Sequence, residues 1–330
     1  MKGAADIVES EGMAQRRAMA KAITLLESTR ADHRVQADDL LQALMPHTGQ
    51  CFRLGLSGVP GVGKSTFIET LGLHLIDKGH RVAVLTVDPS SSISGGSILG
   101  DKTRMERLSV HEKAFIRPSP SSGTLGGVAS MTREAMLVCE AAGYDIVIVE
   151  TVGVGQSETA VSGMTDLFVL MQLPNAGDDL QAIKRGVMEL ADMVVINKAD
   201  LDLAAATRAQ AQMVSSLRIM RMHGMHAEDS SAHMQDRIVL LSALKGDGVA
   251  DFWRSTYRLL KKQRDDGSLQ SKRQNQAAQW MQEKIDSGLR HRFEMHPAVK
   301  VSYAALKLEV IQGHLPPTVA ARRLLEASLS

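Results

Sequence analysis

The most informative run of the sequence reads Gly58-Val59-Pro60-Gly61-Val62-Gly63-Lys64-Ser65-Thr66 and fits the pattern G-x-x-x-x-G-K-[ST]. It follows an apolar stretch at 53–57 that predicts a strand, and it opens a predicted helix at 64–78. In that context, glycines let backbone amides converge on phosphate oxygens, and the helix N-terminus adds the positive end of its dipole. The whole run is therefore a candidate nucleotide site, with Lys64 on the β- and γ-phosphates as a catalytic group and Ser65 on Mg²⁺.

Strand-like and helical stretches alternate on the C-terminal side of this loop. Apolar runs predict further strands at 81–87, 114–117, 144–150, 166–173, 192–197 and 237–242. Most of them are separated by helical patterns, at 126–142, 178–190, 203–221 and 249–263. This alternation predicts an α/β fold, a P-loop domain over residues 49–263 with a mostly parallel sheet covered by helices. Helical patterns also predict an N-terminal extension at 1–48, which begins with one helix over 6–30, and a C-terminal arm at 264–330.

A second motif, Asn197-Lys198-Ala199-Asp200, follows the apolar run Met193-Val194-Val195-Ile196. Its position after a strand fits the N-K-x-D motif that recognises guanine. The carboxylate of Asp200 would accept hydrogen bonds from guanine N1–H and N2–H₂, a donor pair that adenine lacks. A third motif, Ser242-Ala243-Leu244-Lys245-Gly246, resembles the loop whose backbone packs on the guanine edge in GTPases, with Ser242, Ala243 and Leu244 as its candidate site residues. The sequence therefore predicts GTP and GDP as ligands.

Acidic residues at predicted strand ends supply the candidate metal ligands. Glu150, at the end of strand 144–150, can hold Mg²⁺ through water, and Gly153 can donate its amide to the γ-phosphate. Asp88 follows strand 81–87 and begins a Gly- and Ser-rich loop that runs to Asp101. We expect Asp88, Asp101 and Glu150 to serve both the metal and the catalytic step, and the loop to act as a nucleotide-sensing switch.

These motifs, in this order, resemble those of the methylmalonyl-CoA mutase-associated GTPases, in the metallochaperone branch of P-loop GTPases. The resemblance covers essentially all 330 residues, including the helical extensions. It implies an adenosylcobalamin-dependent methylmalonyl-CoA mutase, or a related acyl-CoA mutase, as partner. It implies that GTP hydrolysis is coupled to cofactor loading and to protection from inactivation. It also implies a homodimer built through the C-terminal helices, and it makes a cobalamin adenosyltransferase a further candidate partner.

The resemblance also bears on catalysis. Segment 174–185 corresponds to an additional switch that answers to the mutase, and Lys184 within it is a candidate to bring a cation to the nucleotide. Ras-like GTPases carry a water-positioning Gln directly after the glycine at position 153, where this chain has Val154. We therefore expect slow intrinsic hydrolysis that the partner stimulates.

The composition excludes several other classes of function. Lys plus Arg number 38 and Asp plus Glu 37, so the formal net charge is +1. This balance, with only 3% aromatic residues, argues against a nucleic-acid partner. Two cysteines are too few for a disulfide framework. No apolar run approaches the ~20 residues of a membrane span, and the first residues lack a signal-peptide core, so we expect a cytoplasmic protein without a membrane partner.

Two alternatives stay open at the level of the sequence. A P-loop alone would also suit a small-molecule or protein kinase, although the guanine motif argues against ATP as substrate. A nickel metallochaperone GTPase of the same branch would need Cys or His ligands near the switch segments, and residues 86–101 and 150–157 contain none.

Overall fold

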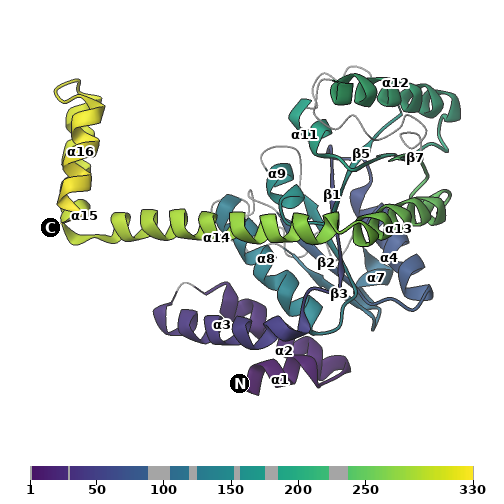
Figure 1. Ribbon diagram of the computed structural model, residues 1–330, viewed down its shortest axis with the longest axis horizontal. Coiled ribbons are helices and arrows are strands. Elements are labelled where there is room, and N and C mark those ends of the chain that lie inside the picture. The colour runs from purple at the N-terminus through teal and green to yellow at the C-terminus, as the bar shows by residue number, and fades with distance from the viewer. Residues whose placement is uncertain are drawn as a thin grey trace. The chain divides into compact units, whose positions relative to one another are not determined.

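A parallel sheet forms the centre of the P-loop domain, as the sequence predicts. The computed structural model describes residues 2–28, 30–87, 105–118, 125–151, 157–174, 185–222 and 237–329. Seven strands, all paired in parallel, stand in the order β3-β2-β4-β1-β5-β6-β7. Figure 1 shows the sheet with helices packed around it. The strands are β1 (Phe52–Gly58), β2 (Val82–Val87), β3 (Ala114–Arg117), β4 (Ile146–Thr151), β5 (Leu167–Gln172), β6 (Met193–Ile196) and β7 (Ile238–Leu240).

Helices connect these strands and form the two ends of the chain. Before the sheet lie α1 (Lys2–Val8), α2 (Gly12–Leu26), α3 (Ala31–Leu44) and the short 3₁₀ helix η1 (Met45–His47). Between and after the strands lie α4 (Lys64–Asp77), α7 (Glu106–Val110), α8 (Leu125–Ala141), α9 (Ser157–Ser162), α11 (Arg185–Leu190), α12 (Leu203–Met222) and α13 (Val249–Asp265). The chain ends with α14 (Ser268–Met295), α15 (Pro297–Ile311) and α16 (Pro317–Ala327).

Each face of the sheet carries its own hydrophobic core, because successive side chains of a strand point to opposite faces. Val82 and Val84 of β2 belong to the core that α4, α7 and α13 cover. Ala83 and Leu85, the alternate residues, belong to the core that α8, α9, α11 and α12 cover. All six residues of β2 are buried, as expected for an inner strand of a parallel sheet.

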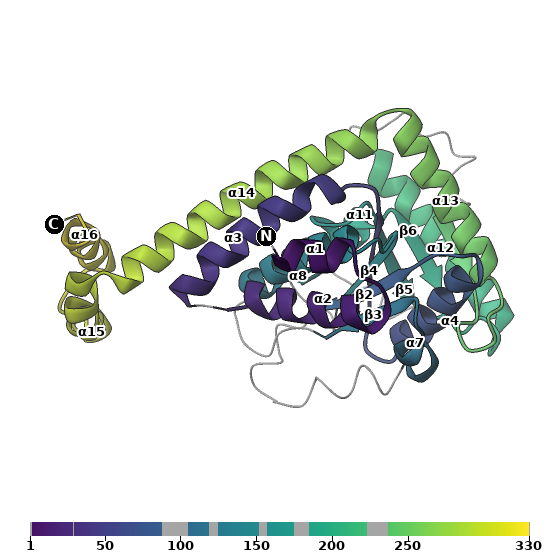
Figure 2. The same cartoon turned by 90° about the horizontal axis from the view of Figure 1, so that it is seen from below.

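The N-terminal helices pack into the second of these cores rather than forming a core of their own. Figures 1 and 2 show α1, α2 and α3 beside α8, and Ile7, Met19 and Leu44 are completely buried there. The amide of Gln15 donates to the carbonyl oxygens of Ile7 (2.7 Å) and Ala142 (3.1 Å), so one side chain joins α1 to the end of α8. The sequence predicts one helix over 6–30, whereas α1 and α2 are separate and Gly12 begins the second.

The same helices hold the outer strand of the sheet. Arg16 of α2 donates to the carbonyl oxygens of His111 (3.0 Å) and of Ala114, which begins β3. Glu27, directly after α2, forms an ion pair with Arg117 at the other end of β3 (2.6 Å). An edge strand exposes unpaired backbone groups, and here α2 satisfies part of that edge.

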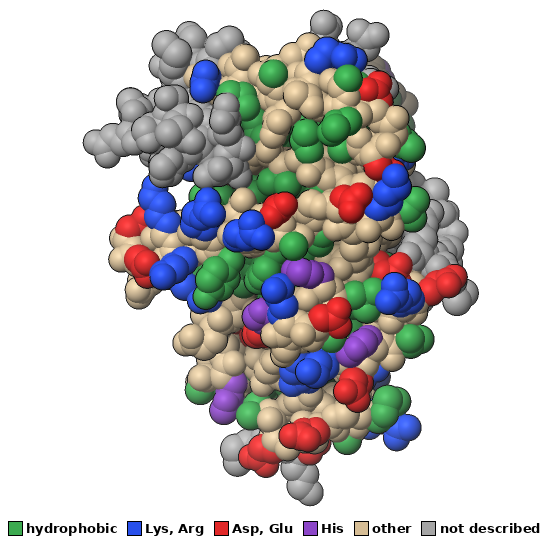
Figure 3. Space-filling model, turned by 90° about the vertical axis from the view of Figure 1, so that its right-hand side faces the viewer, with side chains coloured by type: hydrophobic (Ala, Val, Ile, Leu, Met, Phe, Trp, Pro, Cys, Tyr) green, Lys and Arg blue, Asp and Glu red, His purple; other side chains and the backbone are tan. Residues whose placement is uncertain are grey.

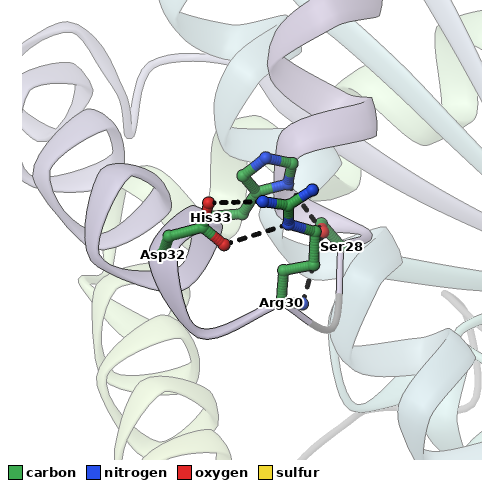
Figure 4. Close-up of polar contacts among 4 residues, drawn as sticks. All are labelled: Ser28, Arg30, Asp32 and His33. Carbon is green, nitrogen blue, oxygen red and sulfur yellow. Dashed lines mark hydrogen bonds and ion pairs between the residues drawn. The ribbon is translucent and has the colours of Figure 1, made fainter.

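A local polar network fixes the start of α3. Arg30 precedes this helix and donates from Nε and Nη2 to the two carboxylate oxygens of Asp32, at 3.0 and 2.8 Å (Figure 4). The ring of His33 lies 2.8 Å from the Ser28 hydroxyl. The hydrogen bond from Arg30 holds the pKa of Asp32 below its usual value, so a negative charge stands in the first turn of α3, where the helix dipole favours it.

The chain divides into two compact units, Met1–Gln270 and Ser271–Ser330. Leu269, just before the division, is buried in the core of the first unit with Leu260 of α13. In the second unit, Val299 of α15 and Ala320 and Leu324 of α16 are buried, and these two helices contact each other.

Two surface properties bear on possible membrane or nucleic-acid partners. Across the described residues, we find no helix with the length and apolarity needed to span a bilayer. On the face drawn in Figure 3, acidic and basic side chains are interspersed. That mixture agrees with the near-zero net charge of the sequence.

Candidate nucleotide site

The glycine-rich loop follows the carboxyl end of β1, the strand that pairs with β4 on one side and β5 on the other. Gly63, its last glycine, has φ 96°, a left-handed conformation that side chains rarely adopt. A Cβ atom at that position would stand 2.6 Å from Nδ2 of Asn197. The loop therefore needs a glycine for two reasons, its backbone angle and the close approach of the second motif.

The start of α4 is suited to bind an anion. Gly63 is its N-cap residue, no side chain caps the helix, and its first turn contains no acidic residue. The amides of the first turn of a helix have no partner within that helix, and the dipole places positive charge there. The backbone of Lys64, Ser65 and Thr66 thus fits the phosphate groups that the sequence predicts.

Lys64 lies on the inner side of the loop. Its Nζ donates to the carbonyl oxygen of Gly58 at 2.5 Å and approaches that of Val59 at 3.4 Å. Burial lowers the pKa of the Lys64 ammonium, while the carboxylates of Glu150 and Glu158 act in the opposite direction. Lys64 therefore contacts the backbone of the loop and lies within electrostatic reach of Glu150.

Glu150 is buried near the carboxyl end of β4, only 3% exposed. It stands in register with Leu56 of β1 and with Thr86 of β2. Thr151, the next residue, donates its hydroxyl to that of Ser57 in β1 at 2.9 Å. Ser65, in the first turn of α4 after the loop that follows β1, and Glu150, near the carboxyl end of β4, both lie toward the carboxyl end of the sheet, where β1 and β4 pair.

Four of the predicted site residues, Asp88, Asp101, Gly153 and Lys184, lie outside the described residues. Their roles stay predictions. Among the residues that are described, no group of three or more His, Cys, Asp or Glu side chains could hold a metal by itself.

Asn197 ties the three predicted nucleotide motifs together. Its side-chain amide donates from Nδ2 to the carbonyl oxygen of Val62 at 2.8 Å, and its Oδ1 accepts the backbone amide of Ala243 at 2.9 Å. The side chain is 2% exposed. One buried residue therefore fixes the second and third motifs against the phosphate loop.

Lys198 has an unusual backbone. Among the described residues it is the only non-glycine residue with positive φ, at 60°. Its Nζ donates to the carbonyl oxygen of Gly61 at 2.9 Å, which lays the side chain along the phosphate loop. Such a left-handed conformation in a non-glycine residue is uncommon and is concentrated at functional sites.

Asp200, the last residue of the second motif, has a charged neighbour in the third. Its side chain is 13% exposed, and its carboxylate lies 3.4 Å from Nζ of Lys245. A hydrogen bond from Ser242 and the nearby Lys245 hold the pKa of Asp200 below its usual value. The carboxylate is thus ionised at neutral pH and can accept the two guanine donors.

The sequence did not indicate Thr70 as a residue of this site, nor the pairing of Lys245 with Asp200. Thr70 of α4 donates its hydroxyl to the carbonyl oxygen of Ala243 at 2.7 Å and so supports the third motif from the helix below the phosphate loop. Lys245 belongs to the predicted third motif, but its pairing with Asp200 depends on how two loops meet. No spacing in the sequence indicates either contact.

A phosphate loop tied by one asparagine to a guanine-type motif, at the carboxyl edge of a parallel sheet, defines the P-loop GTPase class. The family described as methylmalonyl-CoA mutase-associated GTPase MeaB matches residues 19–298. This chain belongs to that family, as the resemblance in its sequence indicated.

Individual relatives agree with this membership. GTPase ArgK of Escherichia coli K12 is 44% identical, over 94% of this chain and 92% of its own. The mouse (Mus musculus) protein called methylmalonic aciduria type A homolog, mitochondrial, is 46% identical, over 95% of this chain and 76% of its own. The solved structure of LAO/AO transport system kinase is 36% identical, with a TM-score of 0.72 over 96% of this chain and 94% of its own. The similarity to this solved structure therefore confirms the fold predicted from the sequence.

Proposed function

We propose that this GTPase serves an adenosylcobalamin-dependent methylmalonyl-CoA mutase, or a related acyl-CoA mutase, as a chaperone. In this proposal, GTP binding and hydrolysis are coupled to loading of the cofactor and to protection of the mutase from inactivation. The match to the mutase-associated family over residues 19–298 carries the proposal. The name of the mouse relative, which refers to methylmalonic aciduria, agrees with it.

The site residues take the following roles in this proposal. The amides of the phosphate loop and Lys64 hold and neutralise the phosphates, while Asn197, Lys198 and Asp200 select guanine. Ser65 and Glu150, with Asp88 and Asp101, would hold Mg²⁺, which supplies positive charge to the phosphate oxygens. Gly153 would donate its amide to the γ-phosphate.

Hydrolysis by the protein alone is proposed to be slow. Val154 stands where Ras-like GTPases carry the glutamine that orients water. We expect a rate far below the ~5–20 s⁻¹ of GAP-stimulated Ras. Binding of the mutase would accelerate it by repositioning a switch segment, with Lys184 supplying a cation.

Assembly and location complete the proposal. Several large apolar side chains of residues 271–330 are exposed, among them Leu289 at 60% and Val301 at 84%. Exposed apolar surface of this kind supports a homodimer formed through the C-terminal helices. A cobalamin adenosyltransferase is the further partner proposed, and the cytoplasm is the proposed compartment.

The experiment is a phosphate-release assay on the full chain with GTP, with and without the purified mutase. We expect at least a tenfold stimulation by the mutase, because a switch must be repositioned for catalysis. Lys64→Ala is the control, since it removes the cation that both ground and transition states need. Equal turnover with and without each candidate mutase would rule out the chaperone role and leave only the GTPase activity in the proposal.

A kinase is the second function to test, because the solved relative is named as one. The guanine motif and its ordered contacts with the phosphate loop favour GTP, whereas most such kinases use ATP. Competition of GTP and ATP for the site separates the two. Equal binding of the two nucleotides would favour the kinase.

A further inference from the structure

The carboxylate proposed to read guanine has a cationic neighbour in the third motif loop. Nζ of Lys245 lies 3.4 Å from Oδ2 of Asp200, and the Lys245 side chain is 58% exposed while that of Asp200 is 13% exposed. We propose that Lys245 is a positioning residue that strengthens guanine recognition through Asp200. This inference rests on the proposed use of GTP and deepens it.

The backbone that carries Lys245 is held in place. The amide of Ser242 donates to the carbonyl oxygen of Asp247 (3.0 Å), and that of Gly246 donates to the carbonyl oxygen of Ser242 (2.9 Å), which closes a tight turn. The amide of Lys245 donates to the Ser242 hydroxyl at 3.3 Å. Because Asn197 and Thr70 anchor the turn through Ala243, the lysine is presented to Asp200 from a fixed position.

The pair is expected to matter for binding rather than for folding. Exposed ion pairs contribute little to stability, because water and salt screen them. A purine that covers Asp200 removes water from an ionised carboxylate, and that desolvation is costly without a counter-charge. The bound purine also lowers the local dielectric constant, which strengthens the attraction between Lys245 and Asp200. Lys245 therefore offsets part of the cost that guanine binding imposes on Asp200.

The test compares Lys245→Met, which keeps the length of the side chain but removes its charge, with Lys245→Arg, which keeps the charge. Equilibrium dissociation constants for GDP, GTP and ATP are measured by calorimetry on the full chain. Lys245→Met should weaken GDP and GTP binding by about 3- to 10-fold. ATP binding should not change, because adenine offers Asp200 no donor pair. Lys245→Arg should restore guanine affinity.

Two controls separate an effect through Asp200 from a general one. Lys261→Met removes an exposed lysine of α13 and should leave all three constants and the melting temperature unchanged. In an Asp200→Asn background, Lys245→Met should have no further effect on GTP binding, because the negative charge of Asp200 with which Lys245 pairs is already absent.

The failures of this inference and of the proposed function are distinguishable. If the wild type prefers guanine nucleotides and Lys245→Met leaves that preference unchanged or increases it, only the role of Lys245 is overturned. An equal loss of ATP and GTP binding in that variant would overturn it as well. A wild type that binds ATP as tightly as GTP would overturn both the GTP assignment and the role of Lys245.

Discussion

At the scale of single residues, Gly63 shows how tightly the phosphate loop is built. Gly63→Ala should lower GDP affinity at least tenfold, because the new Cβ would stand 2.6 Å from Nδ2 of Asn197 at a φ of 96°. Displacing Asn197 would also release Val62 and Ala243. Fluorescent GDP titration and thermal unfolding measure the two effects.

Gly79→Ala is the matched control for this prediction. Gly79 has φ 97°, but no atom lies within 4 Å of a Cβ built on it. Gly79→Ala should lose about 1–2 kcal/mol of stability from backbone strain alone, and its affinity for GDP should be unchanged. If the two variants bind GDP equally well, the contact with Asn197 does not constrain the site.

Residues of the site were predictable to different degrees. Asn197, Lys198 and Asp200 follow a buried strand at a fixed spacing after the phosphate loop, so local pattern and chain order suffice to identify them. The role of Thr70 and the pairing of Lys245 with Asp200 were not predictable, because they arise where α4 and two loops meet in space. Residue identity alone carries no sign of such contacts.

At the scale of elements, one buried ion pair joins α8 to β1. Arg53 of β1 donates from Nε to Glu140 of α8 at 2.6 Å, and the backbone amide of Gly49 donates to the other carboxylate oxygen at 2.6 Å. The side chains are 15% and 1% exposed. The pair lies where η1 leads into the central strand, so it fixes the helix that carries the N-terminal extension against the sheet.

Glu140→Gln should destabilise the fold by about 3 kcal/mol, because it leaves the Arg53 charge without its counter-charge in a mostly buried position. Chemical denaturation at pH 7 measures this. Asp251→Asn, which breaks the exposed Arg254–Asp251 pair of α13, is the control and should cost less than ~1 kcal/mol. Equal effects of the two substitutions would show that burial does not matter here.

The pH dependence of the same pair has a definite sign. Burial raises the pKa of Glu140, but the charge of Arg53 and hydrogen bonds from Arg53, Cys51 and Gly49 outweigh it and hold the pKa below its usual value. A depressed pKa gives stability that is present above the unfolded value of about 4.3 and is lost as the pH falls through the folded value. The difference between wild type and Glu140→Gln should therefore shrink in acid below about pH 4.

Elements were predicted well where apolar runs are long, and less well where they are short. All seven strands were expected, because parallel strands buried on both faces are continuously apolar. The sequence did not indicate α7 or α9, which have only five and six residues. The order of the strands in the sheet could not be predicted from the apolar pattern either. It depends on contacts between residues far apart in the sequence, which place β4 between β1 and β2.

At the scale of the whole molecule, the division after Gln270 sets how the proposed dimer can be tested. A chain that ends at residue 270 keeps Leu269, which is buried in the first unit, and removes the exposed apolar residues that lie beyond it. A cut before Leu269 would damage the core and confuse loss of folding with loss of assembly.

We expect the chain of residues 1–270 to fold, to bind GDP with the affinity of the full protein, and to be monomeric by light scattering, while the full chain is a dimer. The physical reason is that every described motif of the nucleotide site lies within the first unit, whereas Leu289, Val301 and Ile311 of the second are 60%, 84% and 71% exposed. Leu289→Glu with Ile311→Glu in the full chain should also give monomers, because charges cannot be buried unpaired in an interface. A dimeric chain of residues 1–270 would place the interface in the first unit, and a monomeric full chain would remove the homodimer from the proposal.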